Sequence, residues 1–149
     1  MQTIIFASVT LGLTLISCSR ELTEKNVPSL VQNAFRTQFV DARDVDWQKK
    51  DHHYLVEFET GDTKGDHEAL FDTLGTMILY KFETPMAKLP SAVVNAIQSQ
   101  YQDYKIDDIE KLEQEGVTYY QFELEKGMKD LHLVFSDDGV LQNNIAYWD

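Results

Sequence analysis

The sequence predicts an α+β fold: a tandem repeat of one helix plus four antiparallel strands, with all strands in one sheet and both helices on one face. Three observations predict this class. A stretch with helical periodicity occurs twice, a period of two follows each copy, and a glycine turn signal lies near the end of each unit. The 149 residues have room for one domain, or for two small units that share a core.

The two helical stretches are VPSLVQNAFRTQF, which begins at Val27, and LPSAVVNAIQSQY, which begins at Leu89. At an offset of 62 they are identical at Pro28/Pro90, Ser29/Ser91, Val31/Val93, Asn33/Asn95, Ala34/Ala96 and Gln38/Gln100. Proline is tolerated at the first helical position because its missing N–H would have no partner there, and the adjacent serines can satisfy other free N–H groups. Apolar residues then recur with the spacing of one buried stripe. Both stretches are therefore predicted to be amphipathic helices.

After each helix the period changes to two, which is typical of strands with one apolar face. Tyr54, Val56 and Phe58 alternate with Leu55, Glu57 and Glu59, and Tyr120, Phe122 and Leu124 alternate with Tyr119, Gln121, Glu123 and Glu125. Further strands are expected at residues 45–48, 69–72 and 77–83, and at 106–112, 131–136 and 140–146. Turn signals at 73–75 and 137–139 separate the last two strands of each unit. The pattern does not distinguish which side of each last strand is buried, because both sides of the strand are apolar.

A unit of about 60 residues buries too small a share of its surface to be stable alone. Two units whose strands continue into one sheet can share a core, with the helices on one face and the other face uncovered. Alternation predicts which residues lie on that open face and would meet a partner there: Glu57, Glu59, Tyr119, Gln121, Glu123, Glu125 and His132.

The N-terminal residues predict that the protein is located in the cell envelope. Residues 4–16 form an apolar run of thirteen, too short for a membrane-spanning helix but long enough for the core of a signal peptide. Cys18, the one cysteine of the sequence, ends the stretch Leu-Ile-Ser-Cys, which resembles the lipobox of bacterial lipoproteins. The resemblance implies a lipoprotein signal peptide at 1–18, lipid on Cys18, membrane contact through that anchor only, and a polar tether at 19–26. The alternative is a free thiol within a signal peptide.

The net charge of the chain limits the classes of partner that can be expected. Thirteen Lys and Arg against 25 Asp and Glu leave a formal charge of −12, which repels nucleic acid and anionic lipid. With Cys18 used for lipid, the fold would have no disulfide and no thiol chemistry. An acidic sheet with a few aromatic residues suits a basic protein surface. Candidates for interface anchors, as well as for core packing, are Trp47, Tyr119, Tyr147 and Trp148.

One protein family combines these features. The doubled unit, the Val-Pro and Leu-Pro helix starts and the hairpins at Gly75 and Gly139 resemble the β-lactamase-inhibitor-like, PepSY-like family of small periplasmic or lipid-anchored bacterial proteins. The resemblance covers residues 27–147, with repeats at 27–88 and 89–149, and implies a binding module whose open sheet holds a partner. The PepSY name is associated with peptidase inhibition. The β-lactamase inhibitor itself has disulfides that this chain lacks, which counts against that particular activity.

Other polar groups have ordinary structural explanations. His52 and His53 are adjacent, so on a strand they would face opposite sides and could not share a metal ion. Acidic residues at 41–46 and 103–108 could hold calcium, but they lack the glycine and the distal glutamate of a calcium loop. The paired glutamates at 57 and 59, and at 123 and 125, fit strand alternation better than acid–base catalysis. We therefore expect no enzyme activity, no cofactor and no metal site.

The leading hypothesis is a lipid-anchored protein of the bacterial cell envelope, on its periplasmic or outer-membrane side. It would hold an envelope protein or peptide on the open acidic sheet face and could act as an inhibitor. The alternative is a cation-binding envelope protein that uses the same acidic face. The sequence does not identify the partner.

Overall fold

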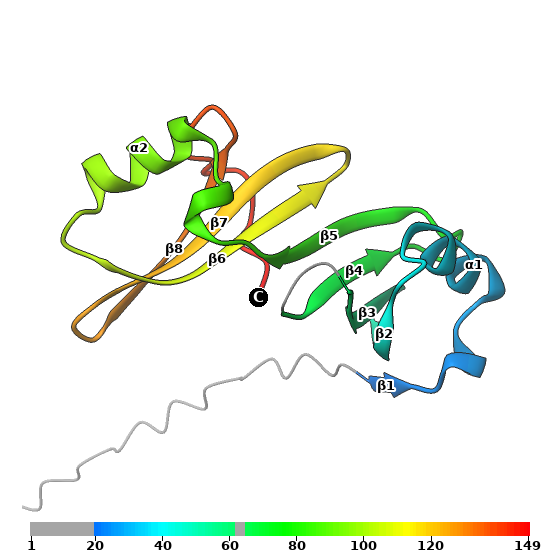
Figure 1. Ribbon diagram of the computed structural model, residues 1–149. Helices are drawn as coiled ribbons and strands as arrows, with labels where there is room; N and C mark the ends of the chain where they lie inside the picture. The colour runs from blue at the N-terminus through cyan, green and yellow to red at the C-terminus, as the bar shows by residue number, and fades with distance from the viewer. Residues whose placement is uncertain (1–19, 62–64) are drawn as a thin grey trace, which may run out of the picture.

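Eight strands form one antiparallel sheet in which each strand pairs with its neighbours in sequence, from β1 to β8 (Figure 1). The computed structural model describes residues 20–61 and 65–149, so the expected signal peptide and Cys18 lie outside the described residues. The strands are β1 (Arg20–Leu22), β2 (Arg43–Lys50), β3 (His53–Glu59), β4 (His67–Phe71), β5 (Met77–Glu83), β6 (Lys105–Gln114), β7 (Val117–Lys126) and β8 (Lys129–Ser136). The helices are α1 (Ser29–Gln38) and α2 (Ser91–Gln100), preceded by the short 3-10 helices η1 (Glu24–Asn26) and η2 (Met86–Lys88). The predicted α+β class and single sheet are confirmed.

Both helices form where the repeated stretches predict them. Pro28 and Pro90 lie at the N-cap, one position earlier than expected, with φ angles of −56° and −57°. Their carbonyl oxygens accept the first helical hydrogen bonds, from Gln32 at 3.0 Å and from Val94 at 3.1 Å. Neither N-cap residue provides a side-chain hydrogen bond. The fixed φ of proline therefore prepares each helix start.

Three apolar clusters fill the fold. In the α1 cluster, helix residues are buried against β2, β3 and β4: Val31, Phe35, Trp47, Val56, Phe58, Ala69 and Phe71. In the α2 cluster, helix residues are buried against β7 and β8: Val93, Ala96, Ile97, Tyr120, Phe122, Leu124, Leu133 and Phe135. The third cluster consists of Leu55, Leu70, Leu79 and Leu112. Leu55 alternates with Val56 along β3, so the third cluster lies on the side of the sheet opposite the α1 cluster.

The hairpin turns that precede β5 and follow β8 press against the helices. Gly75 and Gly139 have φ angles of 85° and 80°, in the left-handed region that favours glycine. A Cβ atom at Gly75 would lie 2.7 Å from the carbonyl oxygen of Leu30, and one at Gly139 would lie 2.6 Å from that of Ala92. Leu30 and Ala92 are equivalent positions of the repeated stretch. The two units therefore share the same contact between turn and helix.

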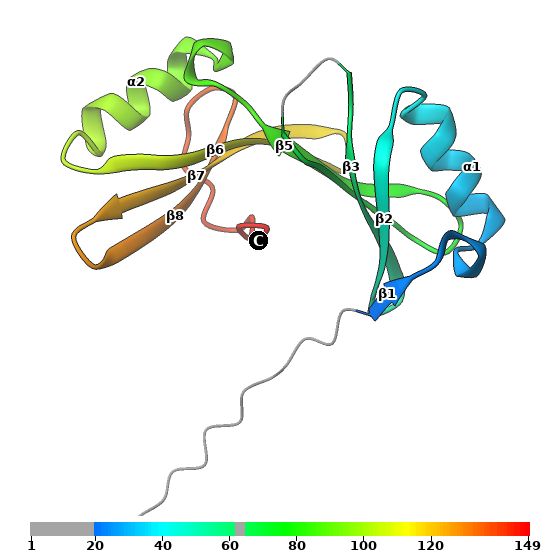
Figure 2. The same cartoon turned by 60° about the horizontal axis from the view of Figure 1, so that its bottom comes forward.

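The prediction of a strand at residues 140–146 is wrong. The structure has one isolated bridge there, between Leu141 and Phe135, so the second unit has three strands instead of four. Gln142 still donates its backbone N–H to the Val134 carbonyl at 2.8 Å, after which the chain leaves the sheet edge. Residues 143–149, called the strap from here on, lie on the side of the sheet away from α2 (Figure 2). The strap leaves the edge because its apolar side chains pack against the third cluster.

The first strand also lies outside the predicted elements. Residues 19–26 are expected to be a polar tether, but Arg20–Leu22 form β1. Leu22 lies opposite Trp47 of β2, and Arg20 lies opposite Lys49. Three residues of the expected tether are therefore part of the sheet.

Candidate functional site

We call the side of the sheet that carries Leu55, Leu70, Leu79, Leu112 and the strap the strap face. Glu57 follows Leu55 at an interval of two on β3, and Tyr119 of β7 lies opposite Leu112. The other residues predicted for an open face continue the same alternation or lie opposite a member of it: Glu59, Gln121, Glu123, Glu125 and His132. The backbone register thus brings all seven predicted residues to the strap face.

The centre of this face is not open, which corrects the prediction. Gln121 is 0% exposed because the strap covers it. Glu59 and His132 are exposed, and the other predicted residues are half-buried: Glu57, Tyr119, Glu123 and Glu125. Alternation identified the correct side of the sheet, but a distant segment of the chain occupies part of that side.

Trp148 holds the strap on the sheet through three kinds of contact. Its backbone N–H donates to Oε1 of Gln121 at 3.2 Å, and its carbonyl oxygen accepts from Nε2 of Gln121 at 2.8 Å. Its indole Nε1–H donates to Oε2 of Glu68 at 3.2 Å. The Nζ atom of Lys50 lies 3.9 Å from the indole centroid, which makes a cation–π contact. One strap residue is thereby held by β2, β4 and β7.

Lys81 of β5 is the centre of an ionic cluster beside the strap. It is 7% exposed, and its Nζ lies 2.8 Å from Oε1 of Glu110 and 3.2 Å from Oε1 of Glu68. Gln121 donates to the other oxygen of Glu110. Because Trp148 contacts both Glu68 and Gln121, these five residues form a closed ring of polar contacts. Burial opposes the charge of Lys81, but the bonds and charges of Glu110 and Glu68 outweigh it and raise the pKa of Lys81.

A second aromatic residue of the strap contacts the predicted histidine. The ring of Tyr147 stacks on His132, with 4.3 Å between centroids and 13° between planes. Nε2 of His132 lies 3.5 Å from Oε1 of Glu123. Burial raises the pKa of Tyr147, and the nearby carboxylates of Glu110 and Glu123 raise it further. Tyr147 and Trp148, both candidates for interface anchors, therefore pack on this chain's own sheet.

Carboxylates crowd the β1–β3 side of the strap face. A hollow of about 410 Å³ there is lined by Glu21, Leu22, Thr23, Asp46, Trp47, Gln48 and Glu57. Burial raises the pKa of Glu57, and the carboxylates of Glu68 and Asp46 add to this shift. The negative charge of Glu57 is therefore held in an unfavourable environment.

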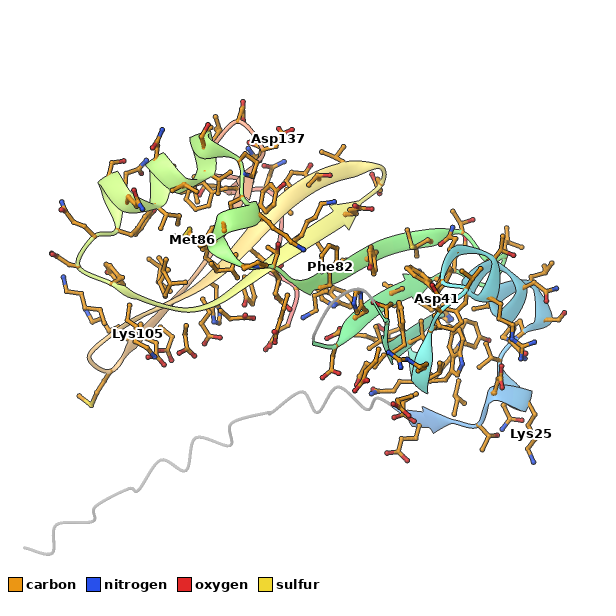
Figure 3. The ribbon with its side chains drawn as sticks, viewed as in Figure 1. Lys25, Asp41, Phe82, Met86, Lys105 and Asp137 are labelled. Atoms are coloured by element: carbon orange, nitrogen blue, oxygen red, sulfur yellow. The ribbon has the colours of Figure 1, made fainter. Side chains whose placement is uncertain are left out.

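Carboxylates also lie on the β6–β8 side of the strap face. Asp108 of β6 lies opposite Glu123 of β7. Lys105, labelled in Figure 3, forms an ion pair with Glu125 at 3.2 Å. The strap thus runs between two acidic regions of one sheet face.

The described part of the chain bears on two further kinds of site, a metal centre and a membrane-spanning helix. Among the residues that the structure describes, no group of three or more His, Cys, Asp or Glu side chains could hold a metal ion. His52 lies exposed in the turn between β2 and β3, and His53 begins β3. Within residues 20–61 and 65–149, no helix has the length and apolar character needed to cross a membrane.

Sequence reasoning missed the polar residues that hold the strap. Lys81 carries one signal, because it is the single charged residue in the otherwise apolar or aromatic run 77–82. Glu68 lies one residue before the predicted strand at 69–72, and Glu110 lies in a strand with several acidic residues, so both resemble ordinary surface positions. Only the pairing of three strands, β4, β5 and β6, shows that these carboxylates meet at Lys81.

The fold defines the class of this protein as a small α+β protein with two PepSY-like repeats. A family model described as "Putative beta-lactamase-inhibitor-like, PepSY-like" matches residues 15–79 and 54–143. The chain belongs to this family. The resemblance predicted from the repeated helix and strands is confirmed.

Solved structures share this fold. A BLIP-like protein from Bacteroides fragilis is 27% identical, with a TM-score of 0.68 over 78% of this chain and 84% of that one. A "putative periplasmic" protein from Bacteroides eggerthii is 17% identical, with a TM-score of 0.71 over 77% of this chain and 85% of that one. A DUF2874 family protein from Bacteroides uniformis is 18% identical, with a TM-score of 0.69 over 76% and 85%. No curated protein matches the sequence.

Proposed function

We propose that this chain is a binding module that holds a protein or peptide partner on the strap face, and that it acts on the partner as an inhibitor. Membership of the β-lactamase-inhibitor-like family and the likeness to a BLIP-like protein support a binding role. The proposal assigns the chain no catalytic role. Glu57, Glu59, Tyr119, Glu123, Glu125 and His132 remain the proposed contact residues, and Gln121 would contact a partner only where the strap has moved away.

The proposed place of action is the bacterial cell envelope. The lipobox-like stretch before Cys18 supports a signal peptide at 1–18 and a lipid anchor on Cys18. The periplasmic description of the Bacteroides eggerthii protein agrees with this address.

We also propose that both helices lie on the face of the sheet opposite the strap. Strand register supports it: Tyr80, which packs against the α1 cluster, lies opposite Glu113 of β6. Lys111 lies two residues from Glu113 on β6 and is opposite Tyr120 of the α2 cluster. Positions two apart on a strand share a face, so the two clusters fall on the same side. The view in Figure 2 agrees with this arrangement.

The kind of partner is inferred from the carboxylates that lie close together on the strap face. The raised pKa of Glu57 indicates that its charge is destabilised by burial and by neighbouring carboxylates. A lysine or arginine of a partner near Glu57 would relieve that repulsion, and a second basic residue on the other side of the strap would be attracted by Glu123 and Asp108. We therefore expect a partner with a basic surface.

Crosslinking in the native envelope, followed by capture of the tagged chain, tests the proposal. The variant Glu123→Lys/Glu125→Lys should lose the captured partner, because it reverses charge on the strap face. The control Asp41→Lys/Asp137→Lys changes net charge equally at two exposed positions, labelled in Figure 3, after α1 and in the turn after β8. If both double variants capture the same proteins as the unsubstituted chain, the acidic face is not the binding surface.

A further inference from the structure

The strap occupies a site to which strands β2 to β7 contribute residues. We propose that this site binds an extended, tryptophan-bearing segment of a basic partner, and that Trp148 fills it in the unbound chain as a displaceable substitute. The inference rests on the proposed function, because it takes the strap face as the partner-binding surface. We call the place of Trp148 the tryptophan site. Its polar walls are Lys50, Glu68 and Gln121, and its floor is the third cluster.

Gln121 recognises the peptide backbone of whatever occupies the tryptophan site. Its side-chain amide bonds both the N–H and the carbonyl oxygen of one residue, at 3.2 and 2.8 Å. A residue in a neighbouring antiparallel strand would offer the same pair of bonds. Gln121 is 0% exposed, and its amide also donates to Glu110, so its orientation is fixed before a peptide arrives. Any extended residue in this place could make the same two bonds.

The side-chain part of the site selects an indole. The carboxylate of Glu68 accepts the indole N–H at 3.2 Å, and Lys81 holds that carboxylate from the other side at 3.2 Å. The Nζ atom of Lys50 lies over the ring at 3.9 Å, where cation–π attraction is strongest for tryptophan. Phenylalanine has no donor for Glu68. A tryptophan is therefore favoured over phenylalanine by the bond to Glu68, and over phenylalanine and tyrosine by the stronger cation–π contact with Lys50.

The strap is held weakly enough to be displaced. Within the described part of the chain, residues 143–146 make no hydrogen bond. Ile145, Tyr147 and Trp148 are half-buried, and the other strap residues are exposed. Segments with few buried contacts open at a low free energy. The ring of polar contacts begins only at Trp148. Loss of that anchor would leave the strap held by the stacking of Tyr147 on His132 and by the packing of Ile145 on the third cluster.

Charge favours a partner segment over the strap. The strap has one charged residue, Asp149, which is acidic like its surroundings. Asp149, Glu110, Glu123 and Asp108 all act on Tyr147, so their carboxylates gather at the end of the strap. A partner segment with lysine or arginine after its tryptophan would replace repulsion by attraction there. Such a segment should compete successfully with the strap.

A synthetic peptide tests the inference in the full chain. The peptide has the sequence of residues 143–149 with Asp149→Lys, and it carries a fluorescent label at its N-terminus. Fluorescence anisotropy measures its binding to the unsubstituted chain and to the Trp148→Ala variant, whose own strap lacks the anchor. If the strap closes the site at least about 90% of the time, the variant should bind about tenfold more tightly. The exposed substitution Met128→Ala is the matched control and should bind as the unsubstituted chain does.

Three further measurements identify the contacts. Replacing the peptide's tryptophan by alanine should abolish binding, and adding Gln121→Ala to the Trp148→Ala chain should weaken binding about tenfold, because the backbone clamp is lost. In a ¹⁵N-labelled unsubstituted chain, which has two tryptophans, excess peptide should shift the Trp148 indole N–H signal and leave that of Trp47 unchanged. This measurement does not require any variant to fold.

The inference is overturned if the Trp148→Ala chain binds the peptide no more tightly than the unsubstituted chain does. It is equally overturned if Gln121→Ala has no effect on binding, or if the Trp148 indole signal does not move at saturating peptide. None of these results depends on the envelope partner. Peptide binding without any crosslinked partner would count against the proposed function alone, and a crosslinked partner without peptide binding would count against this inference alone.

Discussion

Replacing Lys81 by methionine should destabilise the fold strongly, because it removes the cation of the ring that joins four strands to the strap. The side chain of Lys81 is 9% exposed, and those of Glu68 and Glu110 are 24% and 12% exposed. Methionine has a similar volume, so packing changes little. Glu68 and Glu110 would lose their shared cation. Their two carboxylates would then repel each other in a site that is largely shielded from water.

The expected magnitude follows from the burial of the three groups. Removing one partner of a fully buried ion pair costs about 3–5 kcal/mol, chiefly because the other charge stays buried without compensation. Residual exposure of the two carboxylates lets water screen part of this charge, so we expect a loss of about 2–4 kcal/mol. A loss of about 3 kcal/mol should lower the Tm by about 10 °C in a domain of this size.

Urea unfolding followed by circular dichroism measures the effect. The matched control is Lys111→Met on the next strand, where the Lys111–Glu113 pair is 28% and 36% exposed and should contribute no more than about 1 kcal/mol. Adding Glu110→Gln to Lys81→Met should recover at least about 1 kcal/mol, because it removes one of the two uncompensated charges. Equal losses for Lys81→Met and Lys111→Met, or no recovery on adding Glu110→Gln, would refute the reasoning.

Three further results are expected. Gly139→Ala should cost at least about 1 kcal/mol more in urea unfolding than Gly127→Ala, because both glycines have positive φ but only Gly139 approaches a helix carbonyl, and equal losses would contradict this. Burial lowers the pKa of His67 from 6.5, so its contribution to stability is present above pH 6.5 and is lost as the pH falls through the folded-state pKa. The decrease in unfolding free energy between pH 6.5 and about 5 should therefore be smaller in His67→Gln, and an unchanged pH profile would exclude this role. Finally, the Tm should not change with added calcium, zinc or chelator, whereas a cation-dependent rise in Tm would favour the cation-binding alternative.

Local sequence patterns were sufficient to predict most elements of the fold. The helical stripe that includes Val31 and Phe35, and its copy at Val93 and Ile97, record burial against one surface, and this burial is the same in both units. Strands β3 and β7 were predictable for a similar reason, since one side of each faces a helix. The turn glycines were predictable because a positive φ angle excludes most other residues.

The centre of the candidate site was not predictable from these patterns. Alternation places Gln121 on the correct side of β7, but it contains no information about a covering segment 27 residues away. Likewise, Leu141 and Ile145 suit an edge strand as well as a crossing segment. The choice between these arrangements depends on contacts between residues far apart in sequence, such as the bond from Trp148 to Glu68, which spans 80 residues. Such a contact forms only in the assembled sheet, so it produces no periodic pattern in the sequence.

The difference between the two units has a physical cause that also bears on function. β5, the last strand of the first unit, pairs with β4 on one side and with β6 on the other. The corresponding segment of the second unit could pair only with β8, and its other side would be an exposed edge. By leaving that edge, the chain instead packs Ile145 and Trp148 against four leucines that would otherwise form an apolar patch in water. The duplication therefore breaks down at the surface that we propose for the partner, and a partner that displaces the strap must cover the same apolar floor.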